Sequence, residues 1–78
     1  FPQVLVNVRD VDKSKLNSSA TIARAISDFE NGLGDGGRIL VRSSGTEPLV
    51  RVMVEAESLE VATQIANELA ELVRLELK

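Results

Sequence analysis

Two runs rich in β-branched residues, separated by a short polar loop, constrain this chain more than any other feature. The first run covers Arg38 to Ser43 and the second covers Leu49 to Glu57. Both are rich in Val, Ile and Leu, and a period of two predicts strands with one buried face. Because only a few residues separate the runs, the two strands are expected to form an antiparallel hairpin.

A third strand and a first helix precede this hairpin. Residues Gln3 to Arg9 alternate with a period of two and predict a strand. Helical spacing starts at Ala20 and ends at the stretch NGLGDGG, in which Gly32 or Gly34 can adopt the left-handed conformation of a helix cap. The apolar positions expected to face the core from this helix are Ile22, Ala23, Ile26, Phe29 and Leu33.

Small polar residues mark where the helices begin. Asn17, Ser18 or Ser19 can accept a hydrogen bond from a free backbone N–H of the first helix. Ser58 can do the same for a second helix, and Glu60 stands in its first turn, where negative charge is favourable. The apolar stripe expected on this second helix consists of Leu59, Ala62, Ile65, Ala66, Leu69, Leu72 and Val73.

The order strand-helix-strand-strand-helix predicts the fold class. Two helices that cover one face of a small mixed or antiparallel sheet form a two-layer α+β sandwich. The faces rich in Val and Ile are expected to pack against the helices. The opposite face is expected to lie open to water, or to turn toward a cleft or a partner, and it carries Arg9, Asn7, Arg42, Arg51 and Met53.

Composition and charge narrow the possible functions. The chain has 78 residues, enough for one small domain, and its net charge of −3 disfavours non-specific binding to nucleic acids and anionic membranes. The absence of Cys and His removes thiol chemistry and the commonest general base, and the lack of Cys fits a cytoplasmic protein. No apolar run approaches the roughly 20 residues that a membrane span needs. Because the chain starts with Phe1, we expect it to be a piece of a longer protein.

The loop between the paired runs carries the residue types that bind anions. Arg42 offers a planar fork of N–H donors that matches two oxygens of a phosphate, and Ser43, Ser44 and Thr46 add hydroxyl groups. Gly45 can adopt a positive φ, and successive N–H groups around such a glycine can form a concave nest for an anion. These features predict a site for a phosphate dianion. The alternative is an ordinary turn, because the same small residues are common in turns.

Other charged residues near the loop give weaker signals. Arg51 either supports the loop or is simply solvated. Glu47 either orients Arg42 through a charge-assisted hydrogen bond or balances the charge of the loop. Asp10 and Asp12 are too few to predict a metal site, and no residue of this chain is expected to be catalytic.

The stretch GRILVRSSGTEPLVRVMVEAE, Gly37 to Glu57, resembles the C-terminal signature of the α-D-phosphohexomutase superfamily. The continuation LVRVMVEAE and the start FPQVLVNV are most similar to its bacterial phosphoglucosamine mutase branch. The likeness covers nearly the whole chain. One departure is Ser43, where the family often has proline; this change is expected to alter the stiffness of the loop without removing a phosphate contact.

This resemblance implies a fold, a site and a role. The implied fold is the TATA-box-binding-protein-like one of the last of four domains, and the implied phosphate contacts are Arg42, Ser44, Gly45 and Thr46, with Ser43 a weaker contact through its backbone N–H. The whole enzyme interconverts glucosamine 6-phosphate and glucosamine 1-phosphate through a bisphosphate intermediate. Its phosphoserine lies in the first domain, and aspartates of the second domain hold its Mg²⁺. The chain by itself is therefore expected to grip the non-reacting phosphate, to bind no metal and to catalyse nothing.

Two alternatives stay open. One is the same domain of a phosphomannomutase or phosphoglucomutase, because the sugar-selecting loop is expected in the third domain. The other is a non-enzymatic α+β module that binds a protein through its open sheet face. A nucleic-acid-binding module is disfavoured, since no aromatic residue stands at a strand position that would stack bases. The expected partners are a phosphosugar and the other three domains of the parent chain, with no nucleic acid and no membrane.

Overall fold

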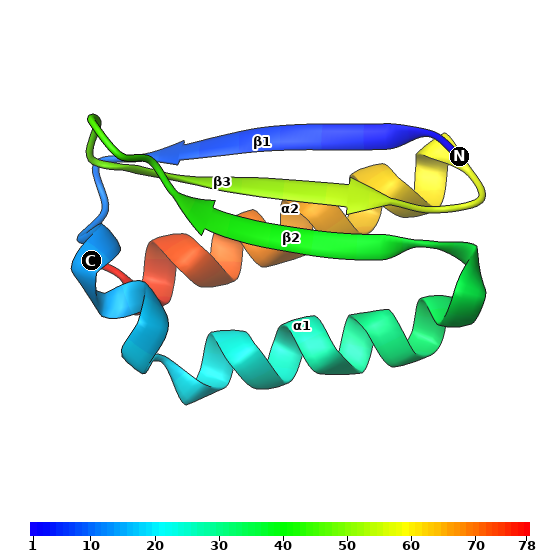
Figure 1. The fold of residues 1–78 in the computed structure, drawn as a ribbon, viewed down its shortest axis with the longest axis horizontal. Coiled ribbons are helices and arrows are strands. Elements are labelled where there is room, and N and C mark those ends of the chain that lie inside the picture. Colours follow the sequence, from blue (N-terminus) through cyan, green and yellow to red (C-terminus); the bar gives the residue numbers. More distant parts are fainter.

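Three strands and two long helices form two layers in the computed structural model, which describes residues 1–78 (Figure 1). In chain order the elements are β1 (Gln3–Arg9), the 3₁₀ helix η1 (Lys13–Ser18), α1 (Ala20–Leu33), the 3₁₀ helix η2 (Gly34–Gly36), β2 (Arg38–Ser43), β3 (Leu49–Glu55) and α2 (Leu59–Glu76). The predicted order of strands and helices is confirmed. The third strand ends at Glu55 rather than at Glu57, and the connection after β1 contains η1, which the sequence did not indicate.

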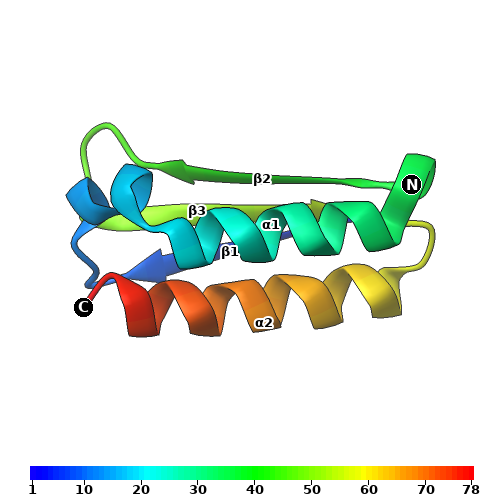
Figure 2. The same cartoon turned by 90° about the horizontal axis from the view of Figure 1, so that it is seen from below.

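The sheet is antiparallel throughout, with the strand order β1-β3-β2. β3 is therefore the central strand, and its Arg51 lies opposite Asn7 of β1 and Arg42 of β2. Both helices lie on the same side of the sheet, which leaves the other face open (Figure 2). The predicted two-layer α+β sandwich is confirmed, and of the two sheet types that the sequence left open the antiparallel one is present.

The core lies between the sheet and the helices and is aliphatic. Every second residue of β3 is fully buried, because the alternation of a strand directs Val50, Val52 and Val54 toward the helices. The other buried members of this cluster are Val8, Val11, Ile22, Ile39, Ala56, Ala62, Ile65, Ala66, Leu69, Ala70, Val73 and Leu77.

Two of the predicted core positions are wrong. Ala23 is exposed, since one step along a helix turns a side chain by about 100° away from the line through Ile22 and Ile26. The partly buried alanine of α1 is Ala25 instead. Leu59 is 60% exposed, because it stands at the first position of α2, ahead of the first buried residue of that helix.

The helix boundaries have the side-chain and glycine caps that the sequence indicates. The Ser19 hydroxyl oxygen accepts a hydrogen bond from the Ile22 N–H at 3.3 Å, and Ser58 accepts one from the Val61 N–H at 3.2 Å. Gly34 ends α1 with a φ of 59°, a conformation that an L side chain rarely adopts. None of the helices delimited in this way combines the length and the apolar character that crossing a membrane requires.

Gly37 lets the start of β2 lie close against the end of β3. A Cβ atom at this position would overlap the carbonyl oxygen of Glu55, a backbone atom that cannot move aside without disturbing the strand pairing. We expect Gly37→Ala to lower the free energy of unfolding by about 2–4 kcal/mol, because overpacking forces the backbone to shift. Urea denaturation followed by circular dichroism measures this change.

Gly45→Ala is the matched control for that substitution. A Cβ atom at Gly45 meets no atom within 4 Å, and its φ lies outside the left-handed region. The free energy of unfolding should change by no more than about 0.5 kcal/mol. Equal losses for the two variants would contradict the role given to the close approach at Gly37.

Asp12 caps η1 and has a carboxyl group with an altered pKa. Its carboxylate accepts hydrogen bonds from the hydroxyl group of Ser14 at 2.5 Å and from the backbone N–H of Ser14 at 3.1 Å. These bonds lower the pKa of Asp12 below its ordinary value of 3.8. A carboxyl group whose pKa is lower in the folded state stabilises the fold at neutral pH, and that contribution is lost as the pH falls below 3.8 through the folded-state pKa.

Ser14→Ala should therefore raise the pKa of Asp12 toward 3.8, since it removes the hydrogen bond from the Ser14 hydroxyl group, which is the largest cause of the shift. The loss in the free energy of unfolding that follows protonation of Asp12 should be smaller in this variant than in the wild-type chain. An NMR titration of the Asp12 carboxyl carbon measures the pKa directly. An unchanged pKa would show that the Ser14 hydroxyl is not the cause of the shift.

Candidate functional site

The loop 44–48 joins β2 to β3 at one end of the sheet, and η1 and the C-terminal end of α2 lie at the same end (Figures 1 and 2). Arg42 and Ser43 end β2, and Leu49 begins β3, so strand pairing holds both ends of the loop. Leu49 is buried at the base of the loop, apart from the core cluster. The structure thus brings the predicted site residues 42–46 together at one turn.

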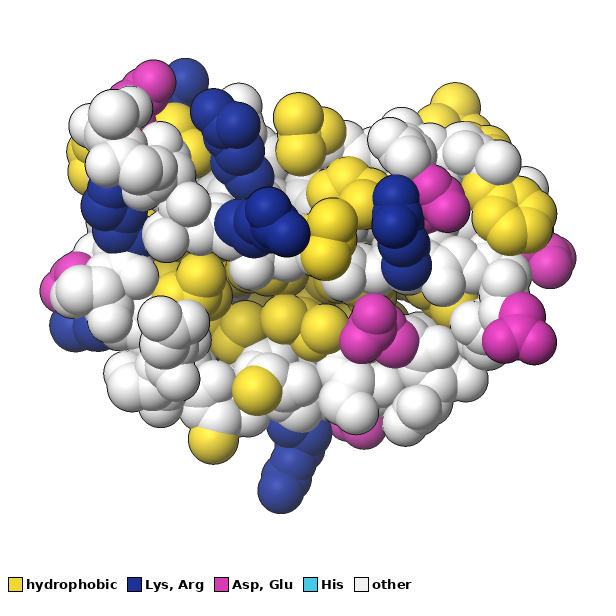
Figure 3. Space-filling model, viewed as in Figure 1, with side chains coloured by type: hydrophobic (Ala, Val, Ile, Leu, Met, Phe, Trp, Pro, Cys, Tyr) yellow, Lys and Arg dark blue, Asp and Glu magenta, His cyan; other side chains and the backbone are white.

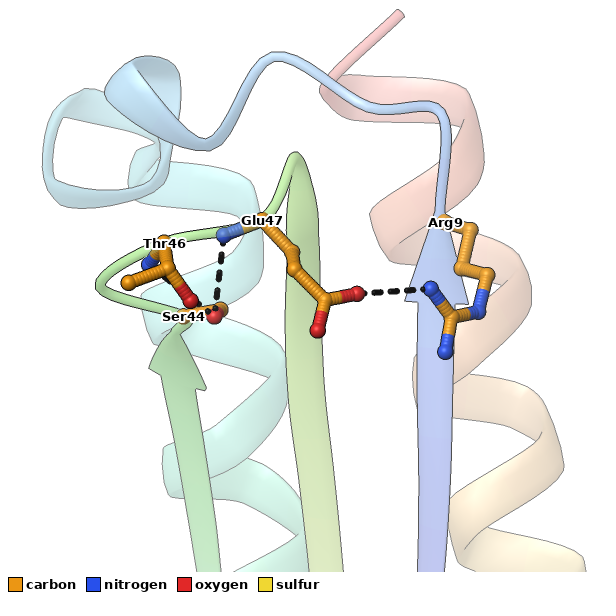
Figure 4. A network of polar contacts seen from close by, with 4 residues as sticks. All are labelled: Arg9, Ser44, Thr46 and Glu47. Atoms are coloured by element: carbon orange, nitrogen blue, oxygen red, sulfur yellow. Dashed lines mark hydrogen bonds and ion pairs between the residues drawn. The ribbon is translucent and has the colours of Figure 1, made fainter.

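Ser44 organises the loop through its side chain and its backbone (Figure 4). Its hydroxyl oxygen accepts hydrogen bonds from the N–H groups of Thr46 and Glu47, at 3.4 Å and 3.2 Å. Its own N–H donates to the carbonyl oxygen of Leu49 at 2.9 Å, and the Leu49 N–H donates to the carbonyl oxygen of Glu47 at 2.8 Å. Such local side-chain bonds hold a turn in one conformation.

The predicted nest of N–H groups around Gly45 is not formed. Gly45 does not lie in the left-handed region; the residues that do are Asp10 and Gly34. The reason is that the Ser44 hydroxyl oxygen already binds the N–H groups of Thr46 and Glu47, so the loop closes without a left-handed glycine. The N–H of Gly45 has no partner within the chain, and the hydroxyl hydrogen of Ser44 donates to none.

Ser43 presents its N–H at the outer edge of the sheet. The bond from the Ser44 N–H to the Leu49 carbonyl oxygen sets the alternation of the antiparallel ladder, which directs the Ser43 N–H away from β3. β2 is an edge strand, so that N–H faces outward. The loop therefore offers two backbone donors that the hairpin does not use, at Ser43 and Gly45, beside the hydroxyl groups.

Two arginines stand directly opposite each other beside the loop. Arg42 of β2 pairs in register with Arg51 of β3, and both side chains are exposed on the open sheet face. Directly opposed residues have Cβ atoms about 4.5–5.5 Å apart, at which distance like charges destabilise the pair. Neither arginine takes part in any of the ion pairs of the molecule. Lys and Arg side chains gather over this end of the strands (Figure 3).

Glu47 does not orient Arg42. Its carboxylate forms an ion pair with Arg9 of β1, with 2.9 Å between the Arg9 Nη1 and Glu47 Oε2 atoms (Figure 4). Both side chains are at least half exposed, so the pair contributes about 0–1 kcal/mol to stability. Its effect on the site is to keep the one carboxylate of the loop away from Arg42, because β3 lies between β1 and β2.

A shallow hollow of about 220 Å³ adjoins the two arginines on the open face. It is lined by Leu5, Leu40, Arg42, Arg51 and Met53. The apolar members form one cross-strand row and the arginines belong to the next, since Met53 lies opposite Leu5 and Leu40 in the register. A larger hollow between α1 and α2 contains no residue of the loop.

The acidic residues do not come together as a metal site. No group of three or more Asp and Glu side chains lies close enough to hold an ion. Asp12 is occupied in capping η1, and Asp10 lies at the end of β1 with a φ of 62°. The residues present therefore do not fit Mg²⁺.

Sequence reasoning missed a lysine that contacts the loop. The Lys13 Nζ atom donates a hydrogen bond to the carbonyl oxygen of Ser44 at 2.5 Å, although 31 residues separate the two along the chain. The N–H of Asp10 donates to the carbonyl oxygen of Pro48 at 3.1 Å. No local pattern identifies these contacts, because they depend on how the connection after β1 passes over the loop.

The chain matches known proteins along most of its length. Residues 5–72 match the family described as phosphoglucomutase/phosphomannomutase, C-terminal domain. Phosphoglucosamine mutase from Streptomyces coelicolor is 58% identical over 74 residues, which cover 95% of this chain and 16% of that protein. Phosphoglucosamine mutase from a Nocardioides species is 57% identical over 77 residues, 99% of this chain and 17% of that protein. The chain thus spans about a sixth of the length of these relatives.

Solved structures share the fold. N-acetylphosphoglucosamine mutase from Aspergillus fumigatus, in complex with GlcNAc-6P and magnesium, superposes with a TM-score of 0.84 at 31% identity, over 99% of this chain and 16% of that one. An N-acetylglucosamine-phosphate mutase, described as a member of the α-D-phosphohexomutase superfamily in its product complex, gives a TM-score of 0.78 at 28% identity, over 92% of this chain and 15% of that one. The resemblance noted in the sequence is confirmed, and the chain belongs to the phosphoglucomutase/phosphomannomutase C-terminal domain family.

Proposed function

We propose that residues 42–46 bind the phosphate group of a phosphosugar, as the C-terminal domain of a longer phosphohexomutase. The observation that carries this proposal is the pair of arginines, Arg42 and Arg51, which face each other without a carboxylate beside a turn that has unused N–H and O–H donors. A dianion bound between the two guanidinium groups would be attracted to both, and this attraction would outweigh their mutual repulsion.

The donors present suit a phosphate more than a particular sugar. Arg42 and Arg51 each supply a planar fork of donors. Ser44 and Thr46 supply hydroxyl groups, and Gly45 supplies a backbone N–H. A phosphate that does not react is a remote handle, and binding energy from it can orient the reacting end of the substrate. If the intermediate is a bisphosphate, either of its phosphates fits such a site.

The proposed reaction of the longer protein is the interconversion of glucosamine 6-phosphate and glucosamine 1-phosphate. Support comes from the Streptomyces coelicolor and Nocardioides relatives, which are both phosphoglucosamine mutases. A phosphomannomutase or phosphoglucomutase is the alternative, since the matching family includes these enzymes. Assays of the full-length protein with glucosamine, mannose and glucose phosphates distinguish them.

The role proposed for these 78 residues is binding without catalysis. The related Aspergillus structure contains magnesium, whereas the residues of this chain form no carboxylate group for that ion, so we propose that any magnesium is held by other parts of the longer protein. The other domains of that protein are then the partners that complete the binding cleft. No step of phosphoryl transfer is assigned to a residue of this chain.

Arg42→Gln should weaken binding of glucosamine 6-phosphate by about 10- to 100-fold, because one charge-assisted hydrogen-bonding partner is lost. Arg38→Gln is the matched control: Arg38 lies on the same strand and face, and its nearest ionic partner is Glu55 at 3.9 Å. NMR titration of the 78-residue chain measures both affinities, and in the full-length protein Arg42→Gln should raise KM. Equal losses for the two variants would indicate only long-range attraction. Unchanged affinity would favour a protein-binding role for the open face.

The isolated chain should convert no glucosamine 6-phosphate into the 1-phosphate, because it has no His and no carboxylate group that could hold Mg²⁺. A coupled assay with the purified chain, with and without added magnesium and the sugar bisphosphate, measures this. The full-length protein, assayed in parallel, shows that the assay is working. Turnover by the isolated chain would overturn the proposal that these residues bind substrate without catalysing its conversion.

A further inference from the structure

Lys13 donates a hydrogen bond to a carbonyl group that the hairpin leaves without a partner. In a regular antiparallel pair, Ser44 and Leu49 would exchange two hydrogen bonds. The bond from the Ser44 N–H to Leu49 is present, but the Leu49 N–H donates to the Glu47 carbonyl oxygen instead. The carbonyl oxygen of Ser44 is therefore free of the ladder, and it accepts its hydrogen bond from the Lys13 ammonium group at 2.5 Å.

Several hydrogen bonds hold the segment after β1 that contains Lys13. The Asp12 side chain caps η1 through Ser14, and the Asp12 N–H donates to the carbonyl oxygen of Leu77 at 2.6 Å. The Lys15 ammonium group donates to the carbonyl oxygen of Lys78 at 3.0 Å. Because the connection is tied to the C-terminal end of the chain, the partly buried Lys13 is held at the loop rather than free in solvent.

The Ser44 carbonyl and the Gly45 N–H belong to the same peptide unit. In a trans peptide these two groups point in opposite directions, and the molecule has no cis peptide bonds. Fixing the Ser44 oxygen toward Lys13 therefore fixes the Gly45 N–H away from it. That N–H is the backbone donor of the turn that has no partner in the chain. A cation on the carbonyl oxygen also polarises the peptide and strengthens its N–H as a donor.

We propose that Lys13 is a positioning residue for anion binding, which holds and polarises the Ser44–Gly45 peptide so that the Gly45 N–H is aimed at the ligand. This inference rests on the proposed phosphate-binding function of residues 42–46. Lys13 acts through the peptide and does not itself contact the anion. It makes the loop depend on a residue that follows β1, outside the signature stretch.

The test compares Lys13→Met with Lys15→Met in the 78-residue chain. Both substitutions remove one ammonium group from the same connection and change the net charge equally, but only Lys13 contacts the loop. Titrations with inorganic phosphate and with glucosamine 6-phosphate should show about a 5- to 20-fold loss of affinity for Lys13→Met and less than a 2-fold loss for Lys15→Met. Lys13→Arg should restore most of the affinity. Equal losses for the two methionine variants would overturn the proposal.

The ligand-free protein provides a second readout. Lys13→Met should shift the NMR resonance of the Gly45 amide before any anion is added, which a direct contact of Lys13 with the anion does not predict. In the wild-type chain, saturating phosphate should move the Gly45 amide resonance more than those of Thr46 and Glu47, whose N–H groups bind Ser44. This measurement needs no variant, so it tests the contact of the Gly45 N–H with the anion even where Lys13→Met does not fold. Movement of Thr46 and Glu47 without Gly45 would overturn the proposal.

The outcomes separate the two proposals. If the wild-type chain binds phosphate and Arg42→Gln weakens binding while Lys13→Met does not, the positioning role of Lys13 is wrong and the phosphate site stands. If the wild-type chain and the full-length protein bind neither phosphate nor glucosamine 6-phosphate at this loop, the proposed function itself is wrong, and the role of Lys13 in anion binding fails with it.

Discussion

The burial of one face of β3 is the constraint on which the rest of the structure depends. Val50, Val52 and Val54 are fully buried between β1, β2 and the helices, and burying each such side chain contributes about 1.5–3 kcal/mol. Because side chains alternate along a strand, this burial places Arg51 on the open face. A shift of one residue in the pairing would exchange the two faces, so the same burial fixes the register that brings Arg42 opposite Arg51.

The two arginines illustrate how a stable sheet can hold an arrangement that is unfavourable in isolation. Opposed guanidinium groups repel each other, and in this molecule no carboxylate relieves them, because Glu47 pairs with Arg9. The cost is small enough for the valine face to offset, since both arginines are exposed and water screens their charges. Under the proposed function, the same repulsion is what a phosphate dianion relieves.

The loop owes its conformation to side chains as much as to its backbone. Ser44 closes the turn with its hydroxyl oxygen and takes a bond from Lys13 on its carbonyl oxygen, so two different segments hold one residue. The bonds divide the donors of the loop into two groups. The N–H groups of Thr46 and Glu47 bind the Ser44 hydroxyl oxygen, whereas those of Ser43 and Gly45 are not used within the hairpin. A rigid turn with a few free donors costs less entropy to engage than a mobile one.

Local pattern predicted the elements well and the side-chain contacts poorly. The strands, the caps at Ser19 and Ser58 and the two-layer arrangement follow from period, capping chemistry and turn composition. The nest at Gly45 did not form, and neither did the pairing of Glu47 with Arg42, which was one of two alternatives for Glu47, because in each case another partner took the group. The competitors are the Ser44 hydroxyl oxygen in the first case and Arg9 of a different strand in the second.

The sequence by itself determined which residues alternate, where the helices start and stop, and that an arginine and small hydroxyl residues stand at one turn. Those features are local, since periodicity and capping involve residues only a few positions apart. The tertiary structure alone decided that β3 lies between β1 and β2, and hence that Arg42 faces Arg51. It also decided that Lys13 reaches Ser44 across 31 residues of chain, because a hydrogen bond between distant segments exists only once the whole core has brought them together.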